Sequence, residues 1–337
     1  MRARLGAPRP SQGPVLALVL LFVLSLLAGA ARACGGDGDG GAHWDREIDV
    51  KGRRRSLLSF QGRRCGAVMP SADVLQAVEF RLAAYSAKEA ARGSLGGAVY
   101  YIPTYVYNVV SSDGSDRGSV PEATLRAQVD ALNEAYATAV TPDGAVSNSG
   151  DQAGINWRFD LQGITTIKAG DMCEPTNEKA IKMANRKGGK GALNLYITDL
   201  SACGLLGYST WPWELDPKAG KQDAQTMDGV VIHYATLPGG SYKPYDMGRT
   251  CIHETGHWMG IYHVFQSGCS KGGDLVDDTP YQAAPTEGCP SFRDTCPQPG
   301  EDPFWNFMDY TDDRCMKGFT AGQHKRMEAM WQLHRAG

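Results

Sequence analysis

Long hydrophobic stretches are nearly missing from this sequence of 337 residues. Only one apolar run approaches the ~20 residues that a membrane-spanning helix needs, which argues against a protein with several spans. There is no internal repeat, and no Asn-x-Ser/Thr acceptor occurs, so N-glycosylation gives no clue to the compartment. Hydrophobic residues at 42% and charged residues at 21% are ordinary for a chain that buries a core, which argues against disorder throughout.

Positive charge is scarce in the larger, C-terminal part of the chain. Residues 93–337 contain 20 Lys and Arg against 29 Asp and Glu, whereas residues 1–92 contain 14 against 8. An acidic surface repels phosphate backbones, which argues against nucleic acid as a partner. Clustered carboxylates could instead hold calcium.

The single apolar run lies at about residues 15–27, after three arginines and before an Ala-Arg-Ala sequence. This pattern predicts a signal peptide over residues 1–33, cleaved after Ala33 or Ala30, and hence a secreted, extracellular protein without stable membrane association. An uncleaved membrane anchor is the alternative, but the run is short for a span. A bacterial lipoprotein signal is another, because Cys34 follows, although Ala-Arg-Ala fits that signal poorly.

We predict a pro-segment over residues 34–95. Its first half, residues 34–62, is rich in Gly, Asp and Arg and shows little apolar periodicity, which is typical of a flexible, protease-sensitive region. A helix is predicted at about residues 71–91, where apolar residues recur at helical spacing. The remaining residues, 96–337, suit one globular domain of one or two lobes.

Strands and helices alternate in the first two thirds of that domain. Dense β-branched and aromatic residues predict strands at residues 98–110, 155–167, 193–198 and 229–234. Apolar periodicity predicts helices at residues 121–137, 178–185 and 321–333. This order predicts an α/β (α+β) fold with a mixed sheet backed by helices. After His263 the chain becomes rich in Gly, Pro, Asp and Cys until about residue 316.

The segment from Thr250 to His263 carries the strongest chemical signal. On a helix, His253 and His257 lie one turn apart and direct their imidazoles at one ion. Gly260 can adopt a positive φ, end the helix and let His263 arrive as the third ligand. Three neutral nitrogens leave a fourth zinc position open for water, which is the arrangement of a catalytic site.

Glu254 follows the first ligand and can reach a water on the ion without ligating it. We therefore expect Glu254 to act as the general base in peptide hydrolysis and to return the proton to the departing amine. Two alternatives stay open. A thermolysin-like peptidase takes its third ligand from a separate glutamate, against which Gly260 and His263 argue. A catalytically inactive secreted module could bind zinc and calcium for structure or adhesion alone.

Thr250–His263 matches the extended metzincin motif, and Asn306-Phe307-Met308-Asp309-Tyr310 resembles the Met-turn of the pappalysin and cytophagalysin-like family. In that resemblance Met308 forms an apolar floor beneath the zinc, and Tyr310 helps to stabilise the oxyanion. Taken alone, a methionine and a tyrosine are more often plain core residues.

The resemblance runs from about Val99 to the end of the chain. It implies an upper lobe, about residues 96–263, with a twisted mixed sheet and the zinc-binding helix, and an irregular, disulfide-linked lower lobe, about residues 264–337. Protein or peptide substrates would lie extended between the lobes. We expect them to pair with an edge strand at residues 229–234.

Nine cysteines fit an exported protein in which most are paired. For the four cysteines of the predicted lower lobe, sequence alone allows three pairings. The family resemblance implies Cys269–Cys296 and Cys289–Cys315. Cys173 and Cys203 could form a further disulfide, and Cys251, on the zinc helix, is more often a small core residue.

Arg64-Cys65-Gly66 resembles a cysteine switch, in which a pro-segment thiolate occupies the open zinc position. The alternative for Cys65 is a disulfide, for example with Cys34. If it is a switch, activation requires a cut between Cys65 and Val99.

Residues 273–280 offer oxygen ligands in a tight loop, which suits calcium. In the resembling family the positions of Asp274 and Thr279 are calcium ligands. A solvated acidic turn is the alternative.

Overall fold

The computed structural model describes residues 63–92, 98–147, 155–221, 223–270 and 272–336. All of them belong to one compact unit. The predicted signal peptide, residues 34–62, Cys34 and the predicted boundary at residues 95 and 96 lie outside the described residues. None of the described helices is long and apolar enough to cross a membrane.

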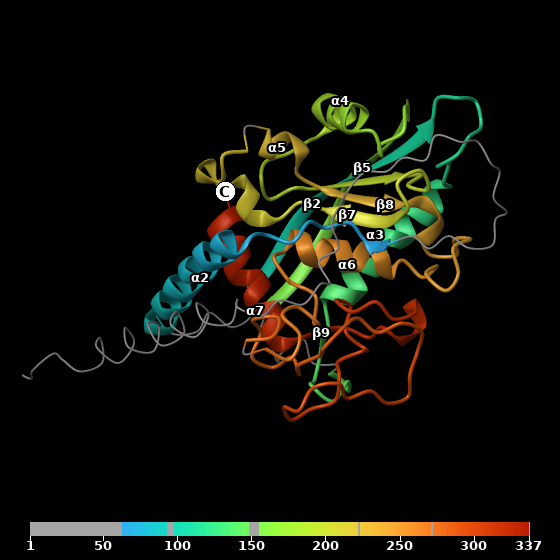
Figure 1. Cartoon of the computed structure of the whole chain (residues 1–337). Coiled ribbons are helices and arrows are strands. Elements are labelled where there is room, and N and C mark those ends of the chain that lie inside the picture. Colours follow the sequence, from blue (N-terminus) through green and yellow to red (C-terminus); the bar gives the residue numbers. More distant parts are fainter. Residues whose placement is uncertain (1–62, 93–97, 148–154, 222, 271, 337) are drawn as a thin grey trace, which may run out of the picture. The chain divides into compact units, whose positions relative to one another are not determined.

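A six-stranded sheet forms the centre of the fold (Figure 1), in the order β1-β7-β8-β6-β2-β5. Its strands in chain order are β1 (Arg63–Cys65), β2 (Ala98–Ser111), β5 (Ile155–Ala169), β6 (Leu193–Thr198), β7 (Leu205–Ser209) and β8 (Val230–His233). Neighbouring strands run parallel except for β7 and β8, which are antiparallel. The mixed sheet of the predicted α/β fold is therefore confirmed.

The predicted edge strand is wrong. The residues expected at the edge, 229–234, form β8, which lies inside the sheet between β7 and β6. The sequence did not indicate β7, which pairs with β8 in antiparallel orientation. The other edge of β7 is occupied by β1, which comes from the predicted pro-segment.

Helices cover both faces of the sheet. The described helices are α2 (Ala72–Arg92), α3 (Glu122–Tyr136), α4 (Pro175–Asn185), α5 (Ala224–Met227), α6 (Arg249–Trp258) and α7 (Ala321–Met330), with a π-helical turn at Trp331–Arg335. Leu132 of α3 and Ile252 of α6 belong to the main core on one face. Ile181 of α4 packs with Tyr107 and Tyr196 of the strands in a second core. Short 3₁₀ helices lie at Pro212–Leu215, Pro217–Ala219, Tyr234–Thr236 and Asp313–Cys315.

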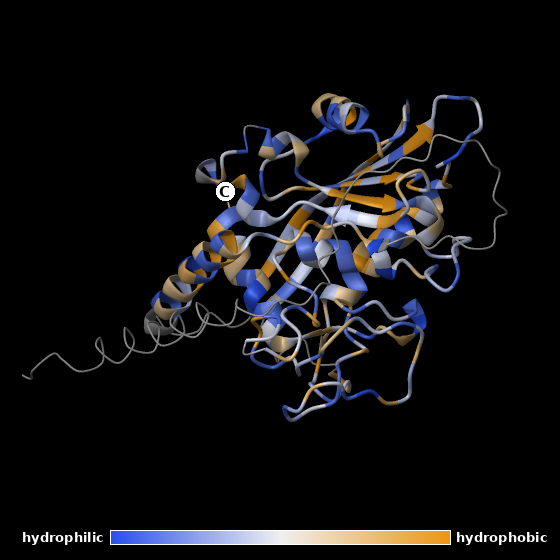
Figure 2. Cartoon of the chain, viewed as in Figure 1, coloured by the Kyte–Doolittle hydropathy of each residue, from blue (hydrophilic) through white to orange (hydrophobic). Residues whose placement is uncertain are grey.

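The described residues between 264 and 318 form an irregular part, in which the regular structure is little more than one 3₁₀ turn. β9 (Phe319–Thr320) follows it directly in sequence and forms a small three-stranded sheet with β3 (Ala139–Val140) and β4 (Val146–Ser147), in the order β4-β3-β9 (Figure 1). Figure 2 shows the apolar residues concentrated in the central strands, whereas this irregular part is largely hydrophilic. Burial of apolar surface alone is therefore a weak source of stability there.

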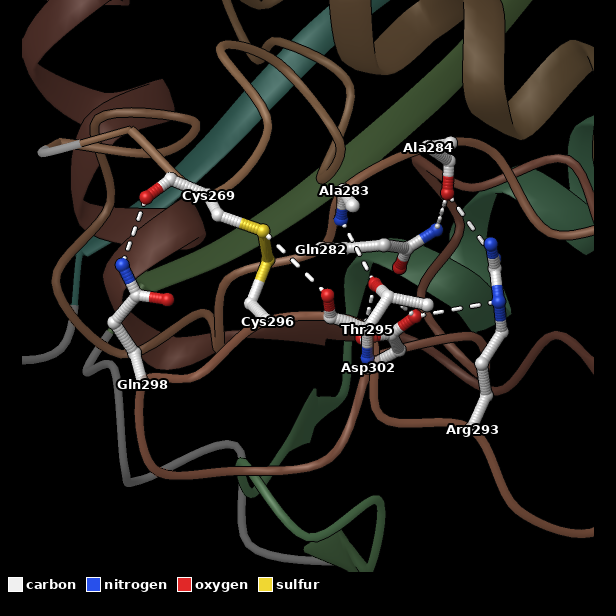
Figure 3. Close-up of a disulfide and its surroundings, with 9 residues drawn as sticks. All are labelled: Cys269, Gln282, Ala283, Ala284, Arg293, Thr295, Cys296, Gln298 and Asp302. Carbon is white, nitrogen blue, oxygen red and sulfur yellow. Dashed lines mark hydrogen bonds and ion pairs between the residues drawn. A yellow bond between two sulfur atoms is a disulfide. The ribbon is translucent and has the colours of Figure 1, made fainter.

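Covalent and polar links hold the irregular part together. Disulfides join Cys269 to Cys296 and Cys289 to Cys315, the pairing that the family resemblance implies, and Cys173 to Cys203 in the sheet region. Beside the first disulfide, Thr295 donates from its backbone and its hydroxyl to the buried Asp302 carboxylate, at 2.9 Å each (Figure 3). Arg293 lies 3.4 Å from the same carboxylate.

Candidate active site

The site is built on α6 and the turn that follows it. Every α6 residue from Thr250 to Trp258 is buried. The helix ends at Trp258, and the chain turns at Gly260, whose φ of +92° is unfavourable for any residue with a side chain. A Cβ atom there would also stand 2.6 Å from Met330. The turn at Gly260 returns the chain so that His263 faces His253 and His257, as the sequence predicted.

The three imidazoles converge through fixed ring orientations. The Nδ1 atom of His253 lies 2.7 Å from the carbonyl oxygen of Phe307, and that of His257 lies 2.7 Å from the carbonyl oxygen of Ile261. A ring that donates its Nδ1–H to a carbonyl presents the lone pair of Nε2, as metal-ligating histidines do. The Nε2 atoms of His257 and His263 are 3.0 Å apart, and the buried Nε2 atom of His253 has no hydrogen-bond partner.

Cys65 brings a fourth ligand atom to the same place. Its Sγ atom and one nitrogen of each of the three histidines lie within 4.8 Å of one another, and all four side chains are buried. Within the described ranges, no other group of three or more His, Cys, Asp or Glu side chains converges in this way. Burial lowers the pKa of His257 to about 4 and keeps its imidazole neutral, as ligation requires. Three imidazoles and a thiolate fit tetrahedral zinc.

Glu254 lies beside the cluster with both carboxylate oxygens buried and without hydrogen-bond partners. Burial raises the pKa of Glu254 to about 8. The nearby Cys65 thiol, Arg64 and Ser209 each oppose that rise. Gly207 of β7 makes room for this side chain, because a Cβ atom at Gly207 would stand 2.8 Å from Cγ of Glu254.

Cys65 is a free thiol at the end of β1. It pairs in parallel register with Gly207, and the following amide of Gly66 donates to the carbonyl of Gly207 at 2.8 Å. The amide of Ala67 lies 3.3 Å from the Cys65 sulfur. The predicted pro-segment thus reaches the cluster as an additional strand of the sheet.

Arg64, the residue before Cys65, makes contacts with distant residues that the sequence did not predict. Its buried guanidinium lies 3.6 Å from the Asp313 carboxylate and 4.6 Å from the centre of the Tyr245 ring. It also donates to the carbonyl of Thr311 and lies 3.1 Å from the sulfur of Met316. One short strand therefore connects β7 with the irregular part on the far side of the cluster.

Met308 and Tyr310, the two residues that the Met-turn resemblance singled out, both contact the segment that carries the three histidines. Met308 is fully buried, and its backbone carbonyl accepts from the amide of Val264 at 3.3 Å. The hydroxyl of Tyr310 lies 3.2 Å from Nε2 of His263. Burial raises the pKa of Tyr310, so the phenol keeps its proton and can act as a donor.

Asp274 and Thr279 lie together but apart from the histidine cluster. The Thr279 hydroxyl donates to Oδ1 of Asp274 at 2.6 Å, while Oδ2 is buried without a partner. Burial raises the pKa of Asp274 to about 7. No further carboxylate of the described residues joins Asp274 in a cluster of three. Calcium binding by this loop stays a prediction.

The sequence did not predict two further contacts near the histidine cluster. The ring centre of Trp211 lies 4.9 Å from that of His257, and Arg326 donates from Nε to the carbonyl of Gly260 at 3.1 Å. Neither residue belongs to a motif or to a periodic pattern near α6. Only the three-dimensional fold brings them to the zinc-ligand turn.

Comparison with known proteins identifies the family. The profile of peptidase family M43, described as pregnancy-associated plasma protein-A, matches residues 176–332. An extracellular metalloprotease of Pyricularia oryzae is 39% identical over 277 residues, which cover 81% of this chain and 90% of the relative. Extracellular metalloprotease 1 of Coccidioides posadasii is 41% identical over 237 residues, which cover 70% and 78%.

Solved structures show the same likeness. A promirolysin mutant of Tannerella forsythia matches with a TM-score of 0.59 and 27% identity, over 80% of this chain and 94% of that chain. Mature mirolysin in complex with a cleaved peptide matches with a TM-score of 0.53 and 29% identity, over 69% and 92%. Because the relatives share more than a third of their residues with this chain over most of their length, the chain belongs to the M43 (pappalysin) family of metalloproteases.

Proposed function

We propose that the protein is a secreted, zinc-dependent endopeptidase that is made as a latent zymogen and hydrolyses peptide bonds of extracellular proteins. The observation that carries the proposal is the convergence of Cys65, His253, His257 and His263 beside the unpartnered carboxylate of Glu254. The relatives named extracellular metalloproteases support both the activity and the location.

In the proposed active form His253, His257 and His263 hold the zinc. Zinc bound there supplies Lewis-acid chemistry, polarising the scissile carbonyl and lowering the pKa of a water from ~15.7 to about 7. Glu254 takes the proton of the attacking water and passes it to the departing amine. The Tyr310 hydroxyl, at the edge of the cluster, donates to the oxygen on which negative charge develops.

In the proposed latent form the Cys65 thiolate would bind the zinc together with the three histidines and would keep the attacking water away. Substrates would bind where β1 lies now, along the open edge of β7 rather than along β8. The greater share of this chain covered by promirolysin, 80% against 69% for the mature form, supports a pro-segment that is part of the latent structure.

The experiment that tests the proposal compares wild-type and Glu254→Ala proteins after the pro-segment has been removed. A mixed peptide library should be cleaved by the wild type and not by the variant, while both bind one zinc ion. A zinc chelator should abolish wild-type cleavage. A wild-type protein that binds zinc but cleaves nothing would instead identify the inactive binding module.

A further inference from the structure

A hydrophobic cluster joins the pro-segment to the rest of the protein through residues that follow Cys65 in the chain. The part of the protein that begins at Ala98, which we call the catalytic part, contributes Trp211, Trp213, Tyr262 and Met330. The pro-segment contributes Val78, with Ala67, Met69, Leu75 and Leu82 packed against it. All four residues of the catalytic part are at most 6% exposed, so this small core is completed by residues of the pro-segment.

One face of α2 makes these contacts. Leu75, Val78 and Leu82 recur at helical spacing on that face, and Glu79 lies between them. Val78 is 5% exposed, whereas Phe80, two residues later on the other side of the helix, is 69% exposed. The helix therefore docks as an amphipathic helix in an apolar groove.

An ion pair between the partly exposed Glu79 and the buried Arg326 fixes the position of the helix in the groove. Glu79 accepts from the two terminal nitrogens of Arg326 at 3.0 and 2.5 Å, and the guanidinium of Arg326 lies 4.7 Å from the Tyr262 ring centre. Arg81 forms a second ion pair with Asp216 at the surface. Because Arg326 is 5% exposed, loss of Glu79 would leave a buried charge without its carboxylate.

The groove continues into the zinc site. The indole nitrogen of Trp211 donates to the carbonyl of Val68 at 2.8 Å, and the same indole packs beside His257. The chain from Cys65 to Val68 thus runs from the cluster of zinc ligands directly into the docked helix. The helix contacts hold the segment without using the thiol.

We propose that residues 63–92 remain on the catalytic part as a separate chain after the linker to Ala98 is cut. Held by α2 in the Trp211–Trp213 groove, they keep blocking the cleft, and dissociation of the helix is the step that releases activity. The partner that fits this groove is therefore the protein's own cleaved pro-segment. This inference rests on the proposed zymogen.

The test uses the Glu254→Ala proenzyme, which cannot digest the fragment, with a specific protease recognition sequence placed in the linker. After cutting and dilution, the wild-type fragment should co-elute with the catalytic part in gel filtration. Val78→Asp should release the fragment, with at least about tenfold weaker retention, because it puts a carboxylate into the apolar groove. Phe80→Asp, the matched control on the exposed face, should behave as the unsubstituted fragment does.

Synthetic peptides covering residues 63–92, added to the processed protein, repeat the comparison without requiring a variant proenzyme to fold. Quenching or a shift of tryptophan fluorescence reports binding. A Cys65→Ser peptide should still bind, and a Val78→Asp peptide should bind at least about tenfold more weakly. Immediate loss of the wild-type fragment, equal binding of the Val78→Asp peptide, or complete loss of binding with Cys65→Ser would overturn the inference. Since binding is measured without catalysis, these results are independent of whether the Glu254 comparison supports peptide hydrolysis.

Discussion

Met308 lies so close to Gly256 that a Cβ atom on this glycine would stand 2.5 Å from the methionine sulfur. Both residues are buried, one on α6 and one in the Met-turn. The contact explains why a residue of low helix propensity occupies the middle of the zinc-binding helix.

Gly256→Ala should therefore destabilise the protein, although alanine normally stabilises a helix. We expect a loss of about 1–3 kcal/mol in the free energy of unfolding from overpacking, together with weaker zinc retention because His257 is the next residue. Urea unfolding and chelator competition measure the two effects. Gly189→Ala, where nothing lies within 4 Å of the new Cβ atom, is the control. A Gly256→Ala protein as stable as wild type would contradict the close contact.

Gly207→Ala should impair catalysis more than metal binding. The new Cβ atom would stand 2.8 Å from Cγ of Glu254 and 3.1 Å from the backbone oxygen of Val231, so the side chain of Glu254, the proposed general base, must move. Displacement of a catalytic group by about 1 Å costs on the order of 100-fold in rate. Peptide turnover by the processed enzyme should fall by about 10- to 100-fold while the zinc content stays at one ion. Gly163→Ala on β5, with open space around it, should keep full activity.

Arg64→Ala should weaken latency. The substitution removes the buried partner of Asp313, and breaking such a pair costs about 3–5 kcal/mol. β1 should then leave β7 more often and expose Cys65. In the zinc-loaded proenzyme, we expect a thiol reagent to modify Cys65 at least about tenfold faster than in wild type. Arg126→Ala, which removes only an exposed pair with Glu122, supplies the baseline; equal rates for the two variants would refute the role of Arg64.

His324 should make stability depend on pH below neutrality. Burial lowers the pKa of His324 in the folded protein to about 4, from an ordinary value of 6.5. Between these values the unfolded chain binds a proton that the folded chain does not, so stability falls as the pH falls from 6.5 to 4. The slope is about 1.4 kcal/mol per pH unit.

The variant His324→Gln tests this slope, because its amide can still donate to the carbonyl of Thr138, which lies 3.0 Å from Nε2 of the histidine. Urea unfolding at several pH values should show a shallower fall for the variant than for wild type. Identical slopes would mean that His324 is not the group responsible.

Local patterns were enough to predict much of the fold. The strand expected at residues 193–198 has the same bounds as β6, and the helix expected at 121–137 agrees with α3 to within one residue at each end. Both segments carry their signal in their own side chains. The convergence of the three histidines was predictable for the same reason, because one helix and one glycine turn set their positions.

Pairings between distant segments were not predictable in this way. β1 has three residues, and it is a strand only because Cys65 aligns with Gly207 in the sheet. β7 has five residues and contains a glycine, so its apolar pattern is weak. Without β7, β8 appeared to be an edge. No pattern in the sequence predicted the ion pair between Arg64 and Asp313.

The pairing of β1 with β7 also bears on the behaviour of the proposed mature enzyme in solution. When residues 63–65 leave, the outward backbone groups of residues 205–207 lose their hydrogen-bond partners and become a template for any extended chain, including a strand of a second molecule. The unpaired edge of β7 that would bind an extended substrate could thus also cause aggregation. During synthesis and export, β1 of the pro-segment would cover this edge and so prevent aggregation of the enzyme at high concentration.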